Sequence, residues 1–262
     1  MKKLYVIKIG GNIIDDEKQL DAFISRFAAI DAHKILVHGG GKLATRVAEA
    51  MGIPQQMVDG RRITDADTLR VVTMVYAGAI NKNMVAKLQQ QDNNAIGVTG
   101  ADGNIIRAHK RQHASIDYGF VGDVDSVNAA LVDILLQQDI CLVCAPLTHD
   151  GQGNLLNTNA DTIAQEMAKA MSNLYDVSLI YCFEKKGVLL DAADDDSVIA
   201  RIDAKSFEQL KNDGIVSQGM IPKLQNAFAA IEAGVSAVTI GHAAALQQLI
   251  TGQSGTLIQK GE

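Results

Sequence analysis

Two apolar segments near the start of the chain each run into glycines, and this repeated arrangement constrains the fold more than any other feature. Residues 4–9 lead into Gly10-Gly11, and residues 34–38 lead into Gly39-Gly40-Gly41. Continuous apolar runs of this length are typical of parallel strands buried on both faces. Residues 42–51, which follow the second glycine cluster, have helical character. The sequence therefore predicts an α/β fold built on parallel strands.

The same two turns predict an anion-binding site. Where a strand passes through glycine into a helix, free backbone N–H groups and the helix dipole converge on one spot, and a ligand can approach the backbone closely. A tight turn that needs glycine only for its geometry explains one such cluster, but two clusters favour binding. Neither cluster matches the Gly-x-x-x-x-Gly-Lys-Ser/Thr or Gly-x-Gly-x-x-Gly pattern, so an ordinary P-loop or dinucleotide-binding fingerprint is not supported.

Three charged residues are candidates for the chemistry at this site. Lys8 lies inside a predicted buried strand, where an unpaired ammonium is costly, so we expect it to meet an anion at the strand end. Lys223 stands in the first turn of a predicted helix, where a cation opposes the helix dipole unless an anion binds there. Asp161 ends the segment Asn157-Thr158-Asn159-Ala160-Asp161 and is also well placed to cap a helix. Residue chemistry alone does not decide whether Lys223 meets a bound anion or has no functional role; it favours the two interpretations equally.

Composition excludes several classes of protein. A chain of 262 residues is long enough for one large α/β domain or two closely joined lobes. The 24 basic and 30 acidic side chains give a net charge of −6 without a basic tail, so nucleic acid is not an expected partner. We find neither an apolar run of about 20 residues nor a signal-peptide pattern, which predicts no membrane span and a cytoplasmic location.

The spacings of two cysteines and two histidines resemble those of redox or metal sites, but their positions in the predicted fold explain them without such a site. Cys141 and Cys144 fall in an apolar run that predicts a buried strand, where residues three apart lie about 10 Å from each other and face opposite sides. A disulfide cannot close over that distance. We predict that both, and Cys182, are reduced core residues. His109 and His113 lie in a polar, basic stretch that predicts a solvated loop or strand end.

Strands and helices alternate along the rest of the chain. Residues 65–90 predict a long amphipathic helix that covers a sheet and leaves room for a partner subunit. Asp102-Gly103 predicts a hairpin turn between strands at 95–100 and 104–108. Asp194-Asp195-Asp196 predicts a solvated turn, with a weak cation site as the alternative. Further strands are expected at 120–123, 140–145, 177–183 and 235–240, and further helices at 126–138, from 161, at 207–212 and at 222–233. Because no linker is visible, any two lobes share one continuous sheet.

Short motifs of glycine, charged and polar residues follow one another along nearly the whole chain. They are Lys8-Ile9-Gly10-Gly11-Asn12, His38-Gly39-Gly40-Gly41, Gly60-Arg61-Arg62-Ile63-Thr64, Thr99-Gly100-Ala101-Asp102-Gly103, Gly119-Phe120-Val121-Gly122-Asp123, Asn157-Thr158-Asn159-Ala160-Asp161, Gly219-Met220-Ile221-Pro222-Lys223 and Gly255-Thr256. No single motif is specific, but the set in this order is highly specific. Taken together, the motifs resemble those of the amino acid kinase family, and within it the acetylglutamate kinases.

The resemblance implies a three-layer αβα sandwich with a mainly parallel eight-stranded central sheet. It implies an N-terminal lobe, residues 1–172, that binds an N-acylglutamate and forms a homodimer through residues 65–90, and a C-terminal lobe, residues 173–262, that binds ATP. The implied reaction transfers the ATP γ-phosphoryl group to the γ-carboxylate of N-acetyl-L-glutamate, or of N-succinyl-L-glutamate, in arginine biosynthesis. Mg²⁺ would bridge the ATP phosphates with few direct protein ligands.

The family's residue roles transfer to the matching positions. Lys8 and Lys223 would stabilise charge on the transferring phosphoryl group, with Asp161 between them fixing their ammonium groups. Backbone N–H groups of Gly11 and Gly40 would support the phosphoryl group and the attacking carboxylate. A carboxylate nucleophile is already ionised at pH 7, so alignment and charge neutralisation suffice without a general base.

Substrate and nucleotide contacts transfer in the same way. The residues expected to bind the N-acylglutamate are Gly40, Gly41, Arg62 and Asn157, of which Arg62 and Asn157 hold its α-carboxylate and amide end. The residues expected to bind the nucleotide are Lys8, Gly10, Gly11, Glu184, Gly187 and Lys223.

The chain departs from the family pattern at two places. Glu184-Lys185-Lys186-Gly187 stands where the family more often has an aspartate-containing strand end. Arg61 precedes Arg62 where an apolar residue is common, and its guanidinium favours a larger, anionic acyl group such as succinyl, with a solvent-exposed Arg61 as the alternative. Other functions considered are those of related kinases of aspartate, glutamate, carbamate or UMP, and a catalytically silent subunit that binds a nucleotide or an acyl-amino acid.

Overall fold

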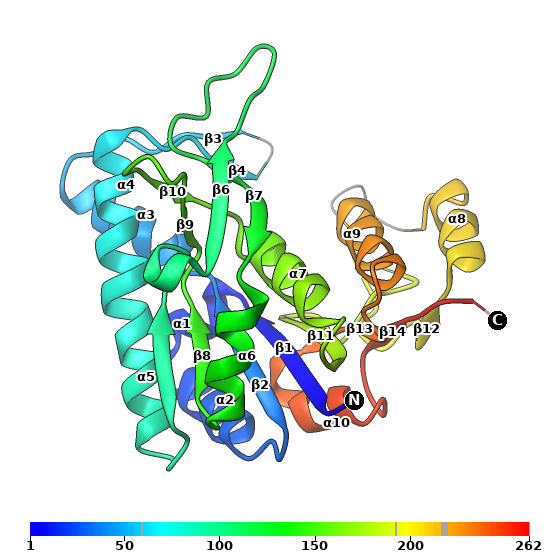
Figure 1. Ribbon diagram of the computed structural model, residues 1–262. Helices are drawn as coiled ribbons and strands as arrows, with labels where there is room; N and C mark the ends of the chain where they lie inside the picture. Colours follow the sequence, from blue (N-terminus) through cyan, green and yellow to red (C-terminus); the bar gives the residue numbers. More distant parts are fainter. Residues whose placement is uncertain (59, 192, 216–219, 262) are drawn as a thin grey trace.

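The computed structural model describes residues 1–58, 60–191, 193–215 and 220–261, and an eight-stranded sheet forms the centre of the molecule (Figure 1). Its strands are β1 (Lys3–Ile9), β2 (His33–His38), β5 (Ala95–Val98), β8 (Cys141–Cys144), β11 (Asp176–Phe183), β12 (Arg201–Ile202), β13 (Ala237–His242) and β14 (Thr256–Ile258). They lie in the order β12–β14–β13–β11–β1–β2–β8–β5, and every neighbouring pair is parallel except β13 with β14. The predicted mainly parallel sheet is confirmed. Gly219, part of one motif quoted above, lies outside the described residues.

Helices cover both faces of this sheet, which gives the three predicted layers (Figure 1). One face carries α6 (Ala129–Gln137), α7 (Ala160–Met171), α8 (Ala204–Asn212) and α9 (Ile221–Glu232), and the other carries α1 (Gly11–Asp15), α2 (Glu17–Ala28), α3 (Gly41–Ala50) and α10 (Leu246–Ile250). In β1, Leu4 and Val6 join the core beneath α7, whereas Ile7 and Ile9 join the core on the α2 side. Because strand side chains alternate between faces, Lys8 projects toward the side of α7 and α9.

The predicted long helix is present and has an irregular middle. It comprises α4 (Ala66–Val72), the π-helical segment η1 (Thr73–Ile80) and α5 (Asn81–Gln89). The Asp65 carboxylate caps its start by accepting the Thr68 N–H at 2.7 Å. The spacing of apolar residues predicted the length of this helix. It did not predict the wider π turns, because both kinds of turn place apolar residues on one side.

The expected hairpin at Asp102-Gly103 is wrong. A second sheet contains β6 (Ile106–Lys110), β7 (Gly122–Val127), β9 (Leu147–His149) and β10 (Leu155–Asn157). β5 pairs with β8 in the main sheet, whereas β6 pairs with β7 and β9. A short 3₁₀ turn, Asp102–Asn104, joins the two sheets, and the Asp102 carboxylate accepts the Thr99 N–H at 2.6 Å. An Asp-Gly pair identifies where the chain turns, but contacts with the rest of the fold decide which strands pair.

The cysteines are buried and free, as predicted. Burial raises the pKa of the Cys141, Cys144 and Cys182 thiols to about 12, so they stay protonated at neutral pH. His109 and His113 are exposed. Within the described ranges, no group of His, Cys, Asp or Glu is arranged to hold a metal ion. No helix in that part of the chain is long and apolar enough to cross a bilayer.

His38, the last residue of β2, links the main sheet to α5. Its Nδ1 lies 2.8 Å from Gly39 O, and its Nε2 lies 3.1 Å from Asn81 Nδ2, which also donates to Val143 O at 2.9 Å. Because the amide nitrogen of Asn81 only donates, Nε2 accepts and the ring proton sits on Nδ1, which donates to Gly39 O. Complete burial lowers the pKa of His38 to about 4. The imidazole is therefore neutral and fixes the start of the second glycine cluster.

We expect this histidine to make the protein less stable in mild acid. Below pH ~6.5 the unfolded chain binds a proton at His38, whereas the folded chain resists protonation down to about pH 4. From these values, the free energy of unfolding falls by about 2 kcal/mol between pH 7.5 and pH 5 through His38 alone. Urea unfolding at both pH values measures this. His38→Gln should lose that part of the pH dependence and the exposed-site control His113→Gln should keep it. Equal pH dependence in His38→Gln and the parent would contradict the assignment.

Candidate active site

The two glycine clusters meet at the carboxyl ends of neighbouring strands. Ile9 of β1 pairs with His38 of β2, and the Gly39 N–H donates to Ile9 O at 3.1 Å. A Cβ built on Gly39 would lie 3.8 Å from the Gly11 nitrogen, so the two turns lie next to each other. Since α1 begins at Gly11 and α3 begins at Gly41, the backbone presents two helix starts side by side. This is the convergence of N–H groups that the sequence predicted.

The individual glycines serve different purposes. Gly40 has φ of +149°, and a Cβ there would lie 2.3 Å from Ile80 Cδ1 and 3.1 Å from Tyr76 Cδ1, both in the π-helical segment. Glycine is therefore required at this position by the protein itself. Gly10 and Gly11 have no atom within 4 Å of the Cβ position. The missing side chains of Gly10 and Gly11 leave open space at the site.

Lys8 and Asp161 form an ion pair at the end of β1. Lys8 Nζ lies 2.8 Å from Asp161 Oδ1, and only 10% of the Lys8 side chain is exposed. The angle at this contact is too far from linear for a hydrogen bond, so the two groups form an ion pair. The cap of α7 is Asn159, whose side-chain oxygen accepts the Asp161 and Thr162 N–H groups at 2.8 and 3.2 Å. The interpretation of Asp161 as the cap is therefore wrong, because Asn159 takes that role and leaves the Asp161 carboxylate to Lys8.

Lys223 joins the same group from the first turn of α9. Its Nζ lies 4.0 Å from the ring centroid of Phe183, the last residue of β11, and Lys8 Nζ lies 5.1 Å from that centroid. Burial lowers the pKa of Lys223, the Asp161 carboxylate raises it, and the Lys8 ammonium lowers it. Two cations and one carboxylate from β1, α7 and α9 thus face a common space.

One cavity beside this group, the Arg62 cavity, has a volume of about 190 Å³. Its lining includes Gly39, Gly40, Gly41, Arg61, Arg62, Tyr76, Asn157 and Ala160. Arg62 lies in β4 (Arg61–Arg62), which pairs with β3 (Met57–Val58), and its guanidinium donates to Gly41 O at 2.9 Å, to Thr45 Oγ1 at 2.8 Å and to Gln55. Asn157 Nδ2 donates to Thr64 Oγ1 at 3.0 Å. All the predicted substrate-binding residues therefore line one cavity.

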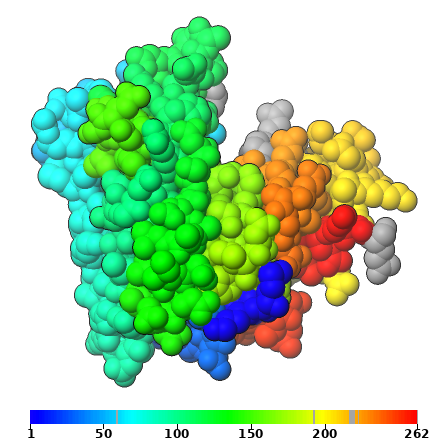
Figure 2. All heavy atoms as spheres, in the orientation of Figure 1, coloured from blue at the N-terminus to red at the C-terminus, as the bar shows by residue number. Residues whose placement is uncertain are grey.

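A second cavity, the Lys223 cavity, has a volume of about 280 Å³. Its lining includes Gly10, Asn12, Phe183, Glu184, Gly187, Met220 and Lys223. A Cβ on Gly187 would lie 2.7 Å from Thr256 Oγ1, so the chain can pass β14 closely only with glycine there. Figure 2 shows the surface hollowed between the green segments around β7 and the orange helix α9, with α7 between them. Four of the predicted nucleotide-binding residues thus line a cavity separate from the Arg62 cavity.

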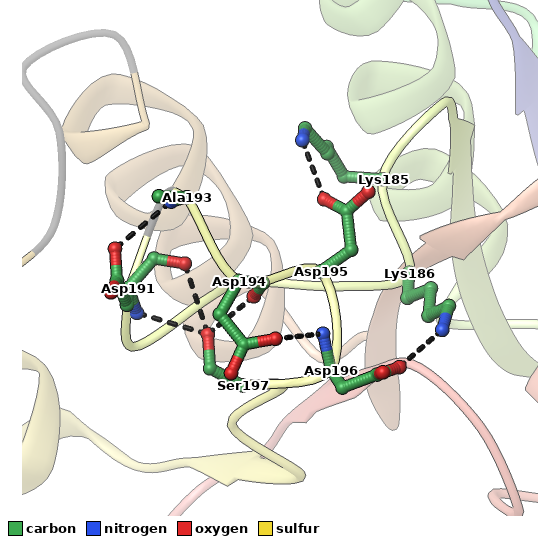
Figure 3. Close-up of polar contacts among 8 residues, drawn as sticks. All are labelled: Lys185, Lys186, Asp191, Ala193, Asp194, Asp195, Asp196 and Ser197. Carbon is green, nitrogen blue, oxygen red and sulfur yellow. Dashed lines mark hydrogen bonds and ion pairs between the residues drawn. The ribbon is translucent and has the colours of Figure 1, made fainter.

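Figure 3 shows the polar contacts within the loop after β11. Lys185 pairs with Asp195 at 2.6 Å, and Lys186 pairs with Asp196. Ser197 Oγ donates to the Asp194 carbonyl at 2.7 Å. The aspartate triplet is a solvated turn, as predicted. Two of its three carboxylates form ion pairs with lysines. Such exposed pairs contribute little stability.

Sequence reasoning missed two residues that belong to this region. Tyr76 is buried, lines the Arg62 cavity and touches the Gly40 position. Phe183 contacts both lysines. The only signal in the sequence was an aromatic residue in an apolar run, which normally indicates core packing.

Comparison with known proteins gives one consistent result. Residues 3–242 match the amino acid kinase family. The chain is 57% identical over 259 residues to an acetylglutamate kinase of Bacteroides thetaiotaomicron, with 99% of each chain covered. It is 56% identical over 259 residues to an acetylglutamate kinase of Phocaeicola vulgatus, also with 99% of each chain covered.

Solved structures agree on the fold. N-acetylglutamate synthase from Neisseria gonorrhoeae superposes with a TM-score of 0.84 over 100% of this chain and 60% of that one, at 21% identity. At that identity the match concerns the fold alone.

Alanine substitutions at Gly40 and Gly10 distinguish a glycine that the fold requires from a glycine that only leaves space open. We expect Gly40→Ala to lower the free energy of unfolding by about 2 to 4 kcal/mol, because it forces a side chain into a left-handed conformation and against Ile80. Gly10→Ala should change it by less than about 0.5 kcal/mol, because Gly10 has φ of −88° and open space around its Cβ position. Denaturant unfolding measures both variants. Equal losses would contradict this distinction.

Proposed function

The chain belongs to the amino acid kinase family, and from that premise we propose that it transfers the ATP γ-phosphoryl group to the γ-carboxylate of an N-acyl-L-glutamate. One observation carries the proposal: Lys8, paired with Asp161, and Lys223 contact the same Phe183 ring, which lines the Lys223 cavity. Ala160, next to Asp161, lines the Arg62 cavity, and Gly10 and Lys223 line the Lys223 cavity. The relatives named acetylglutamate kinase support this acceptor.

The Arg62 cavity is the proposed site of the acyl-amino acid. Arg62 offers a guanidinium that is already held in place, which suits the α-carboxylate of the substrate. Asn157 offers an amide for the acyl-amide end. The backbone N–H groups of Gly40 and Gly41 would then hold the reacting γ-carboxylate. This lobe, residues 1–172, is the proposed acceptor-binding and dimerisation lobe.

The Lys223 cavity is the proposed nucleotide site, within the lobe of residues 173–262. Gly10 and Gly11 leave room for phosphates beside Lys8, and Glu184 and Gly187 also line the cavity. Mg²⁺, when bound with ATP, would neutralise phosphate charge. Because the described residues show no cluster of metal-binding side chains, the ion would be held mainly by the phosphates.

Charge is the main contribution of the protein to the proposed transfer. The acceptor carboxylate is ionised at neutral pH, so the site need not remove a proton. Lys8 and Lys223 would offset the negative charge shared by the nucleotide, the phosphoryl group and the acceptor. Asp161 would hold Lys8 in place through the 2.8 Å ion pair. The rest of the rate enhancement would come from holding the two substrates in line, with the reacting groups next to Lys8 and Lys223.

The acyl group is the part of the substrate that Arg61 would select. Arg61 lines the Arg62 cavity and is half-buried, which supports a contact with the acyl group over the solvent-exposed alternative. Burial and the nearby Arg111 guanidinium lower the pKa of Arg61, while Asp123 raises it. Asp123 is itself paired with Arg111. An unsatisfied positive charge at this place would favour an acyl chain that ends in a carboxylate, such as succinyl.

The wider setting is also part of the proposal. We place the reaction in arginine biosynthesis in the cytoplasm, where free thiols such as those of Cys141, Cys144 and Cys182 persist. We propose a homodimer formed through residues 65–90. Met74 in this run is 47% exposed, and Ile96 in the edge strand β5 is 40% exposed, which supports a covered surface here.

Acyl phosphate formation, trapped with hydroxylamine, tests the function directly. With ATP and Mg²⁺, we expect turnover of N-acetyl- or N-succinyl-L-glutamate but not of free glutamate or aspartate. Lys8→Ala and Lys223→Ala should each lower kcat by about 10²- to 10³-fold, since each removes a charge that stabilises the transition state. Lys211→Ala, at an exposed position of helix α8 outside both cavities, is the control and should match the parent. No turnover of either N-acylglutamate would overturn the proposal in favour of a related kinase or a binding role.

The same assay decides the acyl group. Arg61→Leu should reduce the succinyl-to-acetyl ratio of kcat/KM by about 10-fold or more, because a charge-assisted hydrogen bond is lost for succinyl only. Arg70→Leu, an exposed residue of α4, should leave the ratio unchanged. An unchanged ratio in Arg61→Leu would refute the role of Arg61.

A further inference from the structure

Phe183 occupies an unusual position for an aromatic residue at the end of a buried strand. Its ring centroid lies 4.0 Å from Lys223 Nζ and 5.1 Å from Lys8 Nζ, so one ring contacts both ammonium groups of the site. Phe183 is only partly buried and also lines the Lys223 cavity. Its place therefore differs from that of an ordinary core residue.

The neighbouring ring of Tyr181 holds the Phe183 ring in its orientation. Phe183 stacks on Tyr181, two residues earlier on the same face of β11, with centroids 6.1 Å apart and ring planes at 14°. Tyr181 is buried, and its hydroxyl donates to Asp161 O at 3.3 Å. The stack thus connects the aromatic ring to the start of α7, which carries the third charged group. A ring held in this way presents a defined π surface to both lysines.

The chemistry of the ring explains why it suits this place. The face of an aromatic ring attracts an ammonium group through its quadrupole, most strongly where water is excluded. A carboxylate in the same position would also attract the lysines, but its formal charge would cancel the positive field that phosphate groups require. The cluster of Lys8, Lys223 and Asp161 carries one net positive charge. The ring supports the cations without reducing that charge.

We propose that Phe183 is a positioning residue whose ring contacts the ammonium groups of Lys8 and Lys223, stabilises the Lys223 cation and directs both groups toward the space between the two cavities. This inference rests on the proposed phosphoryl transfer for its catalytic meaning. The contacts themselves are independent of which acceptor is used.

The surroundings of Lys223 make such support necessary. The charged groups that face it are Lys8 on β1, Asp161 on α7, and Glu184 and Lys185 at the end of β11. Among the described residues, Lys223 makes no ion pair, since Asp161 is paired with Lys8. Burial and Lys8 both lower the pKa of Lys223, and Asp161 alone raises it. The ring of Phe183, 4.0 Å from Lys223 Nζ, is a second group that stabilises the protonated form.

Competitive labelling with a trace of acetic anhydride measures this directly, because only the neutral amine reacts. Peptide mass spectrometry across pH gives the pKa of Lys223 without any substrate. We expect Phe183→Leu to lower that pKa by about 0.5 to 1.5 pH units and Phe183→Tyr to preserve it, because only the tyrosine keeps an aromatic face. Lys211, exposed on α8, is the internal reference and should titrate identically in all three proteins.

Steady-state kinetics supplies the catalytic half of the test. With the N-acylglutamate that the parent turns over, Phe183→Leu should lower kcat by about 10-fold with little change in KM for the acceptor, and the basic limb of its pH profile should shift down with the lysine. Phe183→Tyr should stay within about 3-fold of the parent. Circular dichroism and the melting temperature verify that both variants fold.

The two ideas fail separately. If the Lys223 pKa in Phe183→Leu equals that of the parent, the inference about Phe183 is overturned, whatever the enzyme activity. If the pKa falls as expected but no N-acylglutamate is turned over by the parent, the contact stands and the proposed function is overturned. A fall in kcat that Phe183→Tyr does not rescue would also count against the inference, since it would indicate a packing role.

Discussion

The Lys8–Asp161 ion pair is the contact on which the arrangement of this site depends. Lys8 projects from the interior of a parallel sheet, and its ammonium is tolerated there because the Asp161 carboxylate lies 2.8 Å away. The pair ties the end of β1 to the first turn of α7. Asn159 makes this possible by capping α7, which leaves Asp161 available. Removal of either partner would leave a largely buried charge without its counter-charge, so the pair connects the fold to the chemistry.

Two further constraints shape the space around this pair. Gly40 adopts a left-handed conformation against Ile80 and Tyr76, and neutral His38 fixes the preceding carbonyl of Gly39 through Nδ1. The glycine turn is therefore held from both sides by the π-helical segment and the histidine. Phe183 completes the enclosure from β11 and adds no charge. A rigid cradle with a positive interior suits the alignment of two anionic substrates.

Much of this organisation could be predicted from the sequence, because it follows from local patterns. Apolar runs ending in glycine predicted β1 and β2, and parallel strands bring their carboxyl ends together, so Lys8 and both glycine clusters had to meet. The predictions that failed depended on tertiary choices. Whether β5 pairs with β6 or with β8, and whether Asn159 or Asp161 caps α7, is decided by competing contacts that one sequence does not reveal. Phe183 was missed because an aromatic residue in an apolar strand indicates core packing.

A crystal structure with ADP, Mg²⁺, aluminium fluoride and N-acetyl-L-glutamate tests the central claim most directly. The account predicts a planar aluminium fluoride group between the Arg62 and Lys223 cavities. The Nζ atoms of Lys8 and Lys223 should lie about 3 Å from its fluorine atoms, a usual hydrogen-bond distance. It also predicts the α-carboxylate of the acceptor at Arg62 and the nucleotide in the Lys223 cavity. A nucleotide in the Arg62 cavity, or a metal fluoride bound away from both lysines, would contradict the account.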